Sequence, residues 1–240
     1  NLHVVGYSIP IKKTLSLKLL KKNLFTYKKL PNAIPYVTSY YKKNWGFCIQ
    51  YKYFKKLKKD NYKVYIDSEL KKGVLNYGEI IIPGKSKKEV LLSTYICHPS
   101  MANNETSGIS VLIYLSSWIQ ALKKRKYTYR IIFVPEAIGS LAYLKRNYVT
   151  MKKNTIGGFV ITCVGDDKSY SILSSRNENT YSEIISERVL KKIKANYKKY
   201  HWLTRGSDER MFNGPGFDLP ISSIMTVSYT HLTLPTTPYV

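Results

Sequence analysis

The order of apolar and polar residues divides the chain into two parts of different texture. Up to about residue 84, short stretches rich in aromatic and branched residues alternate with lysine- and proline-containing segments. From residue 89 onward, nearly continuous apolar runs alternate with stretches that have apolar residues at helical spacing. Such runs are typical of buried parallel strands, and such spacing is typical of the helices that cover them. The pattern therefore predicts an α/β protein, with helices on both faces of its sheet and a small α+β module near the N-terminus.

The same pattern predicts the individual elements and domains. In the first part, strands are predicted at residues 2–5, 36–41, 46–50, 62–67 and 73–83, and a helix at residues 15–25 with Thr14 as its cap. In the second part, strands are predicted at residues 90–96, 129–134, 158–164 and 219–225, and helices at residues 106–122, 138–148 and 182–194. The predicted domains are residues 1–13, which begin the larger domain, residues 14–84, which form an inserted module, and residues 85–226, which complete the larger domain.

Both ends of the chain are expected to differ from a native protein. The first residue is Asn1, within what reads as mid-fold sequence, so a truncated N-terminus is predicted. Residues 227–240 have neither a helical nor a strand period and are interpreted as a non-native tail.

Charge is the unusual feature of the composition. The chain has 39 Lys and Arg against 15 Asp and Glu, a formal charge of +24, and residues 1–60 contain fourteen lysines and one acid, Asp60. An AT-rich genome also produces a lysine- and tyrosine-rich composition. No zinc-finger, RNA-recognition or basic-zipper pattern accompanies the charge, so a solvated surface is the preferred interpretation and nucleic acid is not a predicted partner.

Membrane and secretory classes are also disfavoured. The longest apolar run, residues 108–119, is too short and too polar to span a bilayer. The three cysteines are far apart and odd in number, which favours a reducing compartment. A cytoplasmic location is therefore predicted.

Three consecutive predicted strands end in residues that can carry chemistry. The strand at 90–96 runs into Cys97 and His98, the strand at 129–134 precedes Glu136, and the strand at 158–164 precedes Asp166. Ligands of open α/β sheets collect at these carboxyl ends, and His, Glu and Asp are the ligand and base types of hydrolytic zinc sites. Each residue alone also fits an ordinary role as a loop histidine, a helix cap or a turn. Their coincidence at one sheet edge favours a site.

Four segments together resemble a known family. They are STYICHPSMANNETSG (93–108), VPEAIGSLAYL (134–144), ITCVGDD (161–167) and RGSDER (205–210). They resemble a bacterial aminopeptidase-like family of unknown function that is sometimes linked to polysaccharide biosynthesis, and AIPYVTSYY (33–41) and NWGFCI (44–49) are similar to its inserted module. The resemblance implies the fold of the co-catalytic zinc aminopeptidases: a mixed, mostly parallel sheet between helices, with the metal site above the strand ends.

The resemblance also implies roles for single residues. His98 matches the first metal-binding histidine, and Glu136 matches the general base. Ser207 and Asp208, together with Arg210, match a segment that borders the substrate pocket. These roles predict that the His98 ring lies within about 5–6 Å of a carboxylate of Glu105, Glu136 or Asp166. They also predict that Asp208 or Arg210 lies within about 10 Å of His98, the width of one ligand.

Departures from the zinc aminopeptidases concern the metal ligands. Asn104 stands where those enzymes have a bridging Asp, and Ala137 stands where an acid follows the general base. The ligand expected in the third strand falls near Thr162, so Glu105 and Asp166 are the candidate replacement ligands. The implied cofactor is zinc, as one ion or two.

Two functions follow, with a third resting on charge alone. The first is a metal-dependent hydrolase acting on an amide bond, in which zinc polarises the carbonyl and Glu136 deprotonates the attacking water. The alternative is a catalytically degenerate aminopeptidase-like scaffold that binds a peptide, amino-sugar or polysaccharide precursor without cleaving it. A small peptide or amino-sugar-type molecule is the predicted substrate. The third class, a basic nucleic-acid-binding protein, rests only on the net charge.

Overall fold

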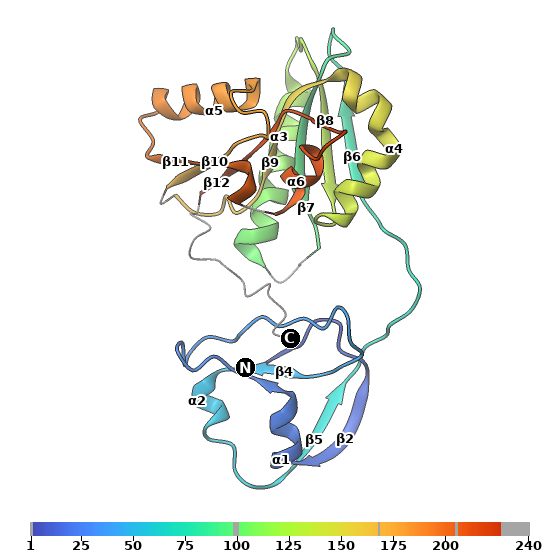
Figure 1. The fold of residues 1–240 in the computed structure, drawn as a ribbon, viewed down its shortest axis with the longest axis vertical. Helices are drawn as coiled ribbons and strands as arrows, with labels where there is room; N and C mark the ends of the chain where they lie inside the picture. Colours follow the sequence, from blue (N-terminus) through green and yellow to red (C-terminus); the bar gives the residue numbers. More distant parts are fainter. Residues whose placement is uncertain (1, 98–100, 168, 205, 227–240) are drawn as a thin grey trace. The chain divides into compact units, whose positions relative to one another are not determined.

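The computed structural model describes residues 2–97, 101–167, 169–204 and 206–226. The contacts within the chain separate two units, one ending at Gly73 and one beginning at Val74 (Figure 1). No helix among the described residues is long and apolar enough to cross a membrane.

The smaller unit contains two small sheets and short helical turns. Its elements are β1 (Leu2–Val4), β2 (Ile11–Ser16), α1 (Leu17–Leu20), the 3₁₀ turn η1 (Lys21–Asn23), β3 (Leu24–Phe25), β4 (Phe47–Ile49), α2 (Tyr51–Phe54) and β5 (Asn61–Ile66). Strands β1, β4 and β3 form one sheet, and β2 pairs with β5 in an antiparallel ribbon. Leu20, Phe47, Val64 and Ile66 form the core between them.

Two predicted elements of this unit are wrong. The helix predicted at residues 15–25 is reduced to α1 and η1, because Thr14 lies within β2 opposite Lys63 instead of capping a helix. Residues 36–41 form a single bridge, from Gly6 to Thr38, instead of a strand.

The larger unit is built on a seven-stranded sheet. Its elements are β6 (Gly78–Ile82), β7 (Glu89–Tyr95), the π-helical turn η2 (Ala102–Thr106), α3 (Ser107–Ala121), β8 (Thr128–Val134), α4 (Ile138–Asn154), β9 (Thr155–Ile161), β10 (Tyr170–Leu173), α5 (Tyr181–Lys192), β11 (Tyr197–Tyr200), the 3₁₀ turn η3 (Trp202–Thr204), α6 (Asp208–Phe212) and β12 (Ile221–Met225). The strand order is β11-β10-β12-β9-β7-β8-β6. The central strands β8, β7, β9 and β12 are parallel, while β6 and β10 pair antiparallel with their neighbours β8 and β12. The predicted mixed, mostly parallel sheet is thus confirmed.

Strand pairing places the division between the units away from the expected domain boundaries. β6 belongs to the large sheet, so the smaller unit ends at Gly73 and not at residue 84. Residues 11–13 pair with β5, so they belong to the smaller unit and not to the larger one.

Apolar side chains cover both faces of the large sheet. On β7, Leu91 packs on the face covered by α4, and the next residue, Leu92, packs on the face covered by α3. Successive side chains of a strand point to opposite faces, so a strand buried on both faces needs the continuous apolar run seen here. Helix α3 approaches the sheet closely: a Cβ at Gly108 would lie 2.4 Å from the Ile161 carbonyl oxygen and from Thr94 Oγ1. Only glycine therefore allows the first turn of α3 to lie this close to the strands.

A buried ion-pair cluster lies near the start of β7. Arg130 donates from Nε and Nη2 to the two oxygens of Glu89 at 2.7 and 3.0 Å, and from Nη1 to Glu79 at 2.9 Å. Tyr143 of α4 joins the cluster with a hydroxyl 2.8 Å from Arg130 Nη1 and hydrogen-bonded to Glu79. Arg130 and Glu89 are only 7% and 5% exposed. The bidentate geometry compensates both buried charges.

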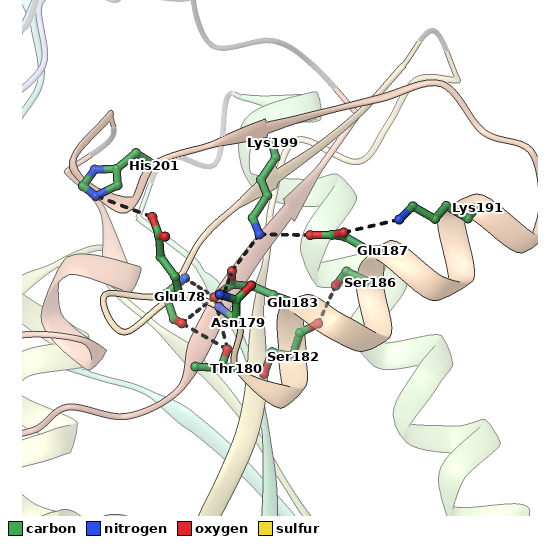
Figure 2. A network of polar contacts seen from close by, with 11 residues as sticks. Glu178, Asn179, Thr180, Ser182, Glu183, Ser186, Glu187, Lys191, Lys199 and His201 are labelled. Carbon is green, nitrogen blue, oxygen red and sulfur yellow. Dashed lines mark hydrogen bonds and ion pairs between the residues drawn. The ribbon is translucent and has the colours of Figure 1, made fainter.

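A second polar network holds the start of α5 (Figure 2). Thr180 precedes the helix, and Glu183 turns back to accept hydrogen bonds from the Thr180 hydroxyl at 3.2 Å and from the Asn179 N–H at 3.2 Å. Ser175 adds two more, from its N–H at 3.0 Å and its hydroxyl at 2.6 Å. Lys199 of β11 lies 3.2 Å from Glu183, which is 1% exposed. Burial opposes ionisation, but the donors from Ser175 and Lys199 lower the pKa of Glu183 below its ordinary value.

Glu183→Gln is expected to lower the free energy of unfolding by about 2–3 kcal/mol, because an amide NH₂ would then face buried donors. The depressed pKa means that Glu183 stabilises the fold above the carboxyl's unfolded pKa, and that this contribution disappears as pH falls through the folded value. Glu187→Gln, one turn later with its side chain 27% exposed, is the control, with an expected loss under about 1 kcal/mol. Urea unfolding at pH 7 and pH 3.5 measures both. Equal losses for the two variants would contradict the role given to Glu183.

Candidate functional site

Two segments far apart in the sequence meet at the carboxyl end of β8. Ser207 Oγ donates to Glu136 Oε1 at 2.5 Å. The Ala137 N–H and the Ser140 hydroxyl donate to Asp208 Oδ1 at 2.7 and 3.0 Å. Glu136 and Ala137 lie in the connection between β8, which ends at Val134, and α4, which begins at Ile138. These hydrogen bonds join that connection to the start of α6 in one polar site. It lies where ligands of α/β sheets bind.

The connection after β8 contains a tight turn centred on Ala137. Its backbone has φ 58° and ψ −68°, and the Ile138 N–H donates to the Glu136 carbonyl oxygen at 2.7 Å. This is a γ-turn, which is rare and strained for a residue with a side chain. Asp208 and Ser140 hold the strained residue from both sides, since Ser140 Oγ also donates to the Ala137 carbonyl oxygen at 2.9 Å.

The acidic groups of this site are deeply buried. Asp208 and Glu209 are fully buried, whereas Glu136 is half-buried. Glu209 accepts from the Ser207 N–H at 2.9 Å and from the Ser223 hydroxyl at 3.2 Å, which fixes the turn before α6. Asp208 Oδ2 has no hydrogen-bond partner among the described residues. Burial, and next the charges of Glu136 and Glu209, raise the pKa of Asp208 to about 7.

Cys97 connects these groups to the residues before α3. Its sulfur accepts from the Glu136 N–H at 3.3 Å, and its thiol donates to Glu105 Oε1 at 3.7 Å. Burial, and then the charges of Glu105, Glu136 and Asp208, raise the pKa of the Cys97 thiol to about 12. The thiol is therefore neutral and unsuited to act as a nucleophile. The three carboxylates make the electrostatic potential at this sheet edge negative.

The remaining predicted residues make other contacts. Asn104 donates to Cys163 Sγ at 3.6 Å. The Asp166 N–H donates to Thr226 Oγ1 at 3.4 Å. The Arg210 guanidinium donates to the Leu203 carbonyl oxygen at 2.7 Å and lies over a tryptophan ring, that of Trp202, 5.2 Å from its centroid.

The expectations that involve His98 lie outside the described residues. His98 itself is not among them. Its closeness to a carboxylate of Glu105, Glu136 or Asp166, and the distance from Asp208 or Arg210 to His98, therefore stay predictions.

The described side chains do not form a metal centre on their own. In residues 2–97, 101–167, 169–204 and 206–226, no group of three or more His, Cys, Asp or Glu is placed to hold a metal ion. The donor chemistry agrees. Asn104 and Thr162 are neutral, and the Thr162 hydroxyl bonds the Asn104 carbonyl oxygen at 2.8 Å. Ala137 contributes only its backbone to the site.

Ser140 is the site residue that sequence reasoning missed. It is fully buried and bonds both Asp208 and the Ala137 carbonyl oxygen. The signal was only partial: the sequence places a serine in the first turn of the helix predicted after Glu136, but it does not show the strained turn three residues earlier. A serine there can bond the backbone three residues earlier.

A family model described as a domain of unknown function (DUF4910) matches residues 3–234. A protein of Clostridium acetobutylicum, provisionally named a polysaccharide biosynthesis protein with an aminopeptidase-like domain, is 42% identical over 229 residues. That match covers 95% of this chain and 52% of the relative, so the chain spans about half the length of the relative.

Solved structures share the fold. A crystal structure from Clostridium acetobutylicum, provisionally described as a peptidase, is 41% identical with a TM-score of 0.91, over 95% of this chain and 53% of that one. A zinc aminopeptidase from Bacillus subtilis is 14% identical with a TM-score of 0.62, over 93% and 68%. An aminopeptidase from Aneurinibacillus is 15% identical with a TM-score of 0.56, over 95% and 69%. The last two likenesses show an aminopeptidase-like fold and nothing more.

The expected family is thereby confirmed, and the inserted-module segments at 33–41 and 44–49 lie inside the matched region. The chain belongs to the family described as a domain of unknown function, DUF4910, and has an aminopeptidase-like fold.

Proposed function

We propose that the site at the end of β8 binds the amino group of a peptide or amino-sugar precursor. The observation that carries this proposal is that Glu136 and Asp208 lie in one short hydrogen-bond network, through Ser207 and Ala137. Among the described residues, no lysine or arginine forms an ion pair with either carboxylate. Asp208 is fully buried and Glu136 is half-buried, so the negative charge of this site is left without a cation among the described residues. An ammonium group from a ligand would supply the missing positive charge.

Glu136 and Asp208 differ in exposure, and we therefore give them different roles. Glu136 is half-buried, and none of the described residues donates to its Oε2, so this oxygen is free to meet a ligand. Asp208 is fully buried and holds the turn that aims Glu136. Glu136 is thus the direct contact, and Asp208 positions it. The name of the Clostridium acetobutylicum relative, which refers to polysaccharide biosynthesis, supports a polysaccharide precursor as the ligand.

Titration of the full-length protein with leucinamide and glucosamine tests this proposal, with the N-acetylated form of each as the uncharged control. We expect the free amines to bind at least about tenfold more tightly than the acetylated forms, because a charged hydrogen bond at a partly buried site is worth about 1.5–3 kcal/mol. Glu136→Gln should remove the preference. Glu178→Gln is the matched control, since that carboxylate is exposed and lies 3.8 Å from His201. Equal affinity for free and acetylated amines would overturn the proposal.

Amide hydrolysis is the second candidate, favoured by the same open Glu136 Oε2. A carboxylate at this place could accept the proton of an attacking water. Turnover of an aminoacyl p-nitroanilide that Glu136→Gln lowers by about 100-fold or more would support hydrolysis. Stoichiometric zinc in the full-length protein would also count against binding alone. Neither result is expected if the site binds its ligand without cleaving it. The neutral residues Asn104, Ala137 and Thr162, at the positions of expected metal ligands, favour binding without cleavage.

A further inference from the structure

The smaller unit has a charge density that the rest of the chain does not share. Residues 1–73 contain 17 lysines, no arginine and 3 acidic residues, which gives a formal charge of +14. Residues 74–240 are more than twice as long, yet their 22 basic and 12 acidic residues give only +10. A genomic bias in composition would act on both parts alike. The concentration of lysine in the smaller unit therefore needs an explanation of its own.

These lysines are available to a partner. Sixteen of the seventeen are exposed, and Lys52 is half-buried. Within residues 2–73, only Lys71 has an acidic partner, Glu69 at 2.7 Å. The unit's positive charge is thus almost uncompensated by its own side chains, and it attracts anions over about a Debye length, roughly 8 Å at physiological salt.

One face of the β2–β5 ribbon gathers lysine and tyrosine. Lys12 lies directly opposite Tyr65, and Thr14 lies opposite Lys63. Directly opposed residues share a face of the ribbon, and all four are exposed. We call this set of four the outer ribbon face. The other face packs into the core through Val64 and other apolar residues, so the ribbon is held rigidly from behind.

Tyr65 gives the outer ribbon face a flat ring beside the charges. Tyr65 is 60% exposed, and Lys12 Nζ lies 5.9 Å from the centroid of its ring. Other tyrosines of the unit are also exposed, namely Tyr7, Tyr27, Tyr40, Tyr41 and Tyr53. Large exposed rings interleaved with lysines suit a partner that has both negative charges and apolar ring faces.

We propose that the smaller unit binds an anionic polysaccharide through the outer ribbon face. A chain of uronic acids carries one carboxylate per sugar, which complements lysine point charges, and the C–H face of each sugar ring can pack on Tyr65. The absence of arginine from residues 1–73 disfavours nucleic acid, because the planar arginine fork is the side chain best suited to bind phosphates and base edges through two hydrogen bonds at once. This surface belongs to the smaller unit, and its proposed role does not depend on the function proposed for Glu136 in the larger unit.

Calorimetric titration of the intact chain with polygalacturonate tests the proposal, with dextran as the neutral polysaccharide and oligothymidylate as the nucleic acid. The double variant Lys12→Gln/Lys63→Gln removes two charges from the outer ribbon face. Lys123→Gln/Lys124→Gln removes two from exposed positions of the larger unit. Tyr65→Ala removes the ring, and Tyr114→Ala, at a residue 73% exposed on α3, is its control.

Polygalacturonate should bind with an affinity that falls as salt rises, and dextran should not bind measurably. The ribbon lysine variant should weaken binding about tenfold, and Tyr65→Ala should weaken it about fivefold with no change in charge. Both controls should stay within about twofold of the parent chain. Equal losses for the ribbon variants and their controls would overturn the proposal, because net charge alone would then explain binding. Tenfold tighter binding of oligothymidylate would overturn it in favour of nucleic acid.

Discussion

Replacing Arg130 with methionine is expected to lower the free energy of unfolding of the larger unit by about 3–5 kcal/mol. Arg130 is 7% exposed and makes three hydrogen bonds to the carboxylates of Glu89 and Glu79. Methionine fills much of the same volume but leaves Glu89 charged, buried and without a cation. The cost is therefore dominated by the carboxylate that remains, and not by lost packing.

Two further variants separate that cause from a general loss of packing. Arg130→Met/Glu89→Gln should recover part of the loss, since no buried charge is then left at Glu89. Arg146→Met changes an exposed arginine of α4 and should cost less than about 0.5 kcal/mol. Urea unfolding followed by helical circular dichroism reports mainly on the larger unit, because its long helices α3, α4 and α5 dominate that signal. A double variant less stable than Arg130→Met would refute the buried-charge explanation.

The second large effect is a pH dependence that belongs to Asp208. Its pKa is raised to about 7 in the fold, from an ordinary value of 3.8. A raised pKa means that the folded state holds the proton more tightly than the unfolded chain does. The stabilisation that protonated Asp208 gives the fold is complete below about pH 4, and it is lost as the pH rises through about 7. Wild-type protein should therefore lose on the order of a few kcal/mol between pH 4 and pH 8 that the Asp208→Asn variant does not lose.

Thermal and urea unfolding of both proteins across this pH range measures the difference. The amide oxygen introduced by Asp208→Asn would still accept hydrogen bonds from the Ala137 N–H and the Ser140 hydroxyl, so the local structure should survive. Asp167→Asn, at an exposed carboxylate, is the control and should follow the wild-type curve. Parallel pH curves for wild type and Asp208→Asn would show that Asp208 is ionised throughout, against the argument from burial.

Sequence reasoning predicted the strongly patterned elements and missed the short ones. The run that became β7 is apolar on both faces, and α3 follows a regular helical spacing, so both were predicted to within one residue at each end. β9 begins three residues earlier than predicted, because Thr155 and Ile156 extend it before the glycines. β11 was not predicted, because two of the four residues in its sequence YKKY are lysines, which are not typical of strands. It is an edge strand that pairs only with β10. Short polar strands of this kind depend on a neighbour for their stability.

The site was predictable in its residue types but not in its connections. Glu136 follows a buried strand, which is a local signal, and Ser207 with Asp208 came from family resemblance. Nothing local indicates that Asp208 bonds the backbone of Ala137, 71 residues away, or that Ala137 has a positive φ. Alanine rarely adopts that conformation, so its presence follows only from the tertiary contacts that hold it.

Those contacts give the molecule an order of assembly. A ribosome releases Glu136 and Ala137 well before it releases Ser207 and Asp208, so the nascent chain can pair β6, β7 and β8 while the strand end is still incomplete. Until then the turn at Ala137 has only its local bonds, from the Ile138 N–H and the Ser140 hydroxyl. Bringing Asp208 to Ala137, 71 residues earlier, closes a long loop and costs chain entropy, which the contacts formed afterwards offset. The site around Glu136 and Asp208 is thus among the last parts of the unit to be completed, and the nascent chain can pair β6, β7 and β8 before Ser207 reaches Glu136.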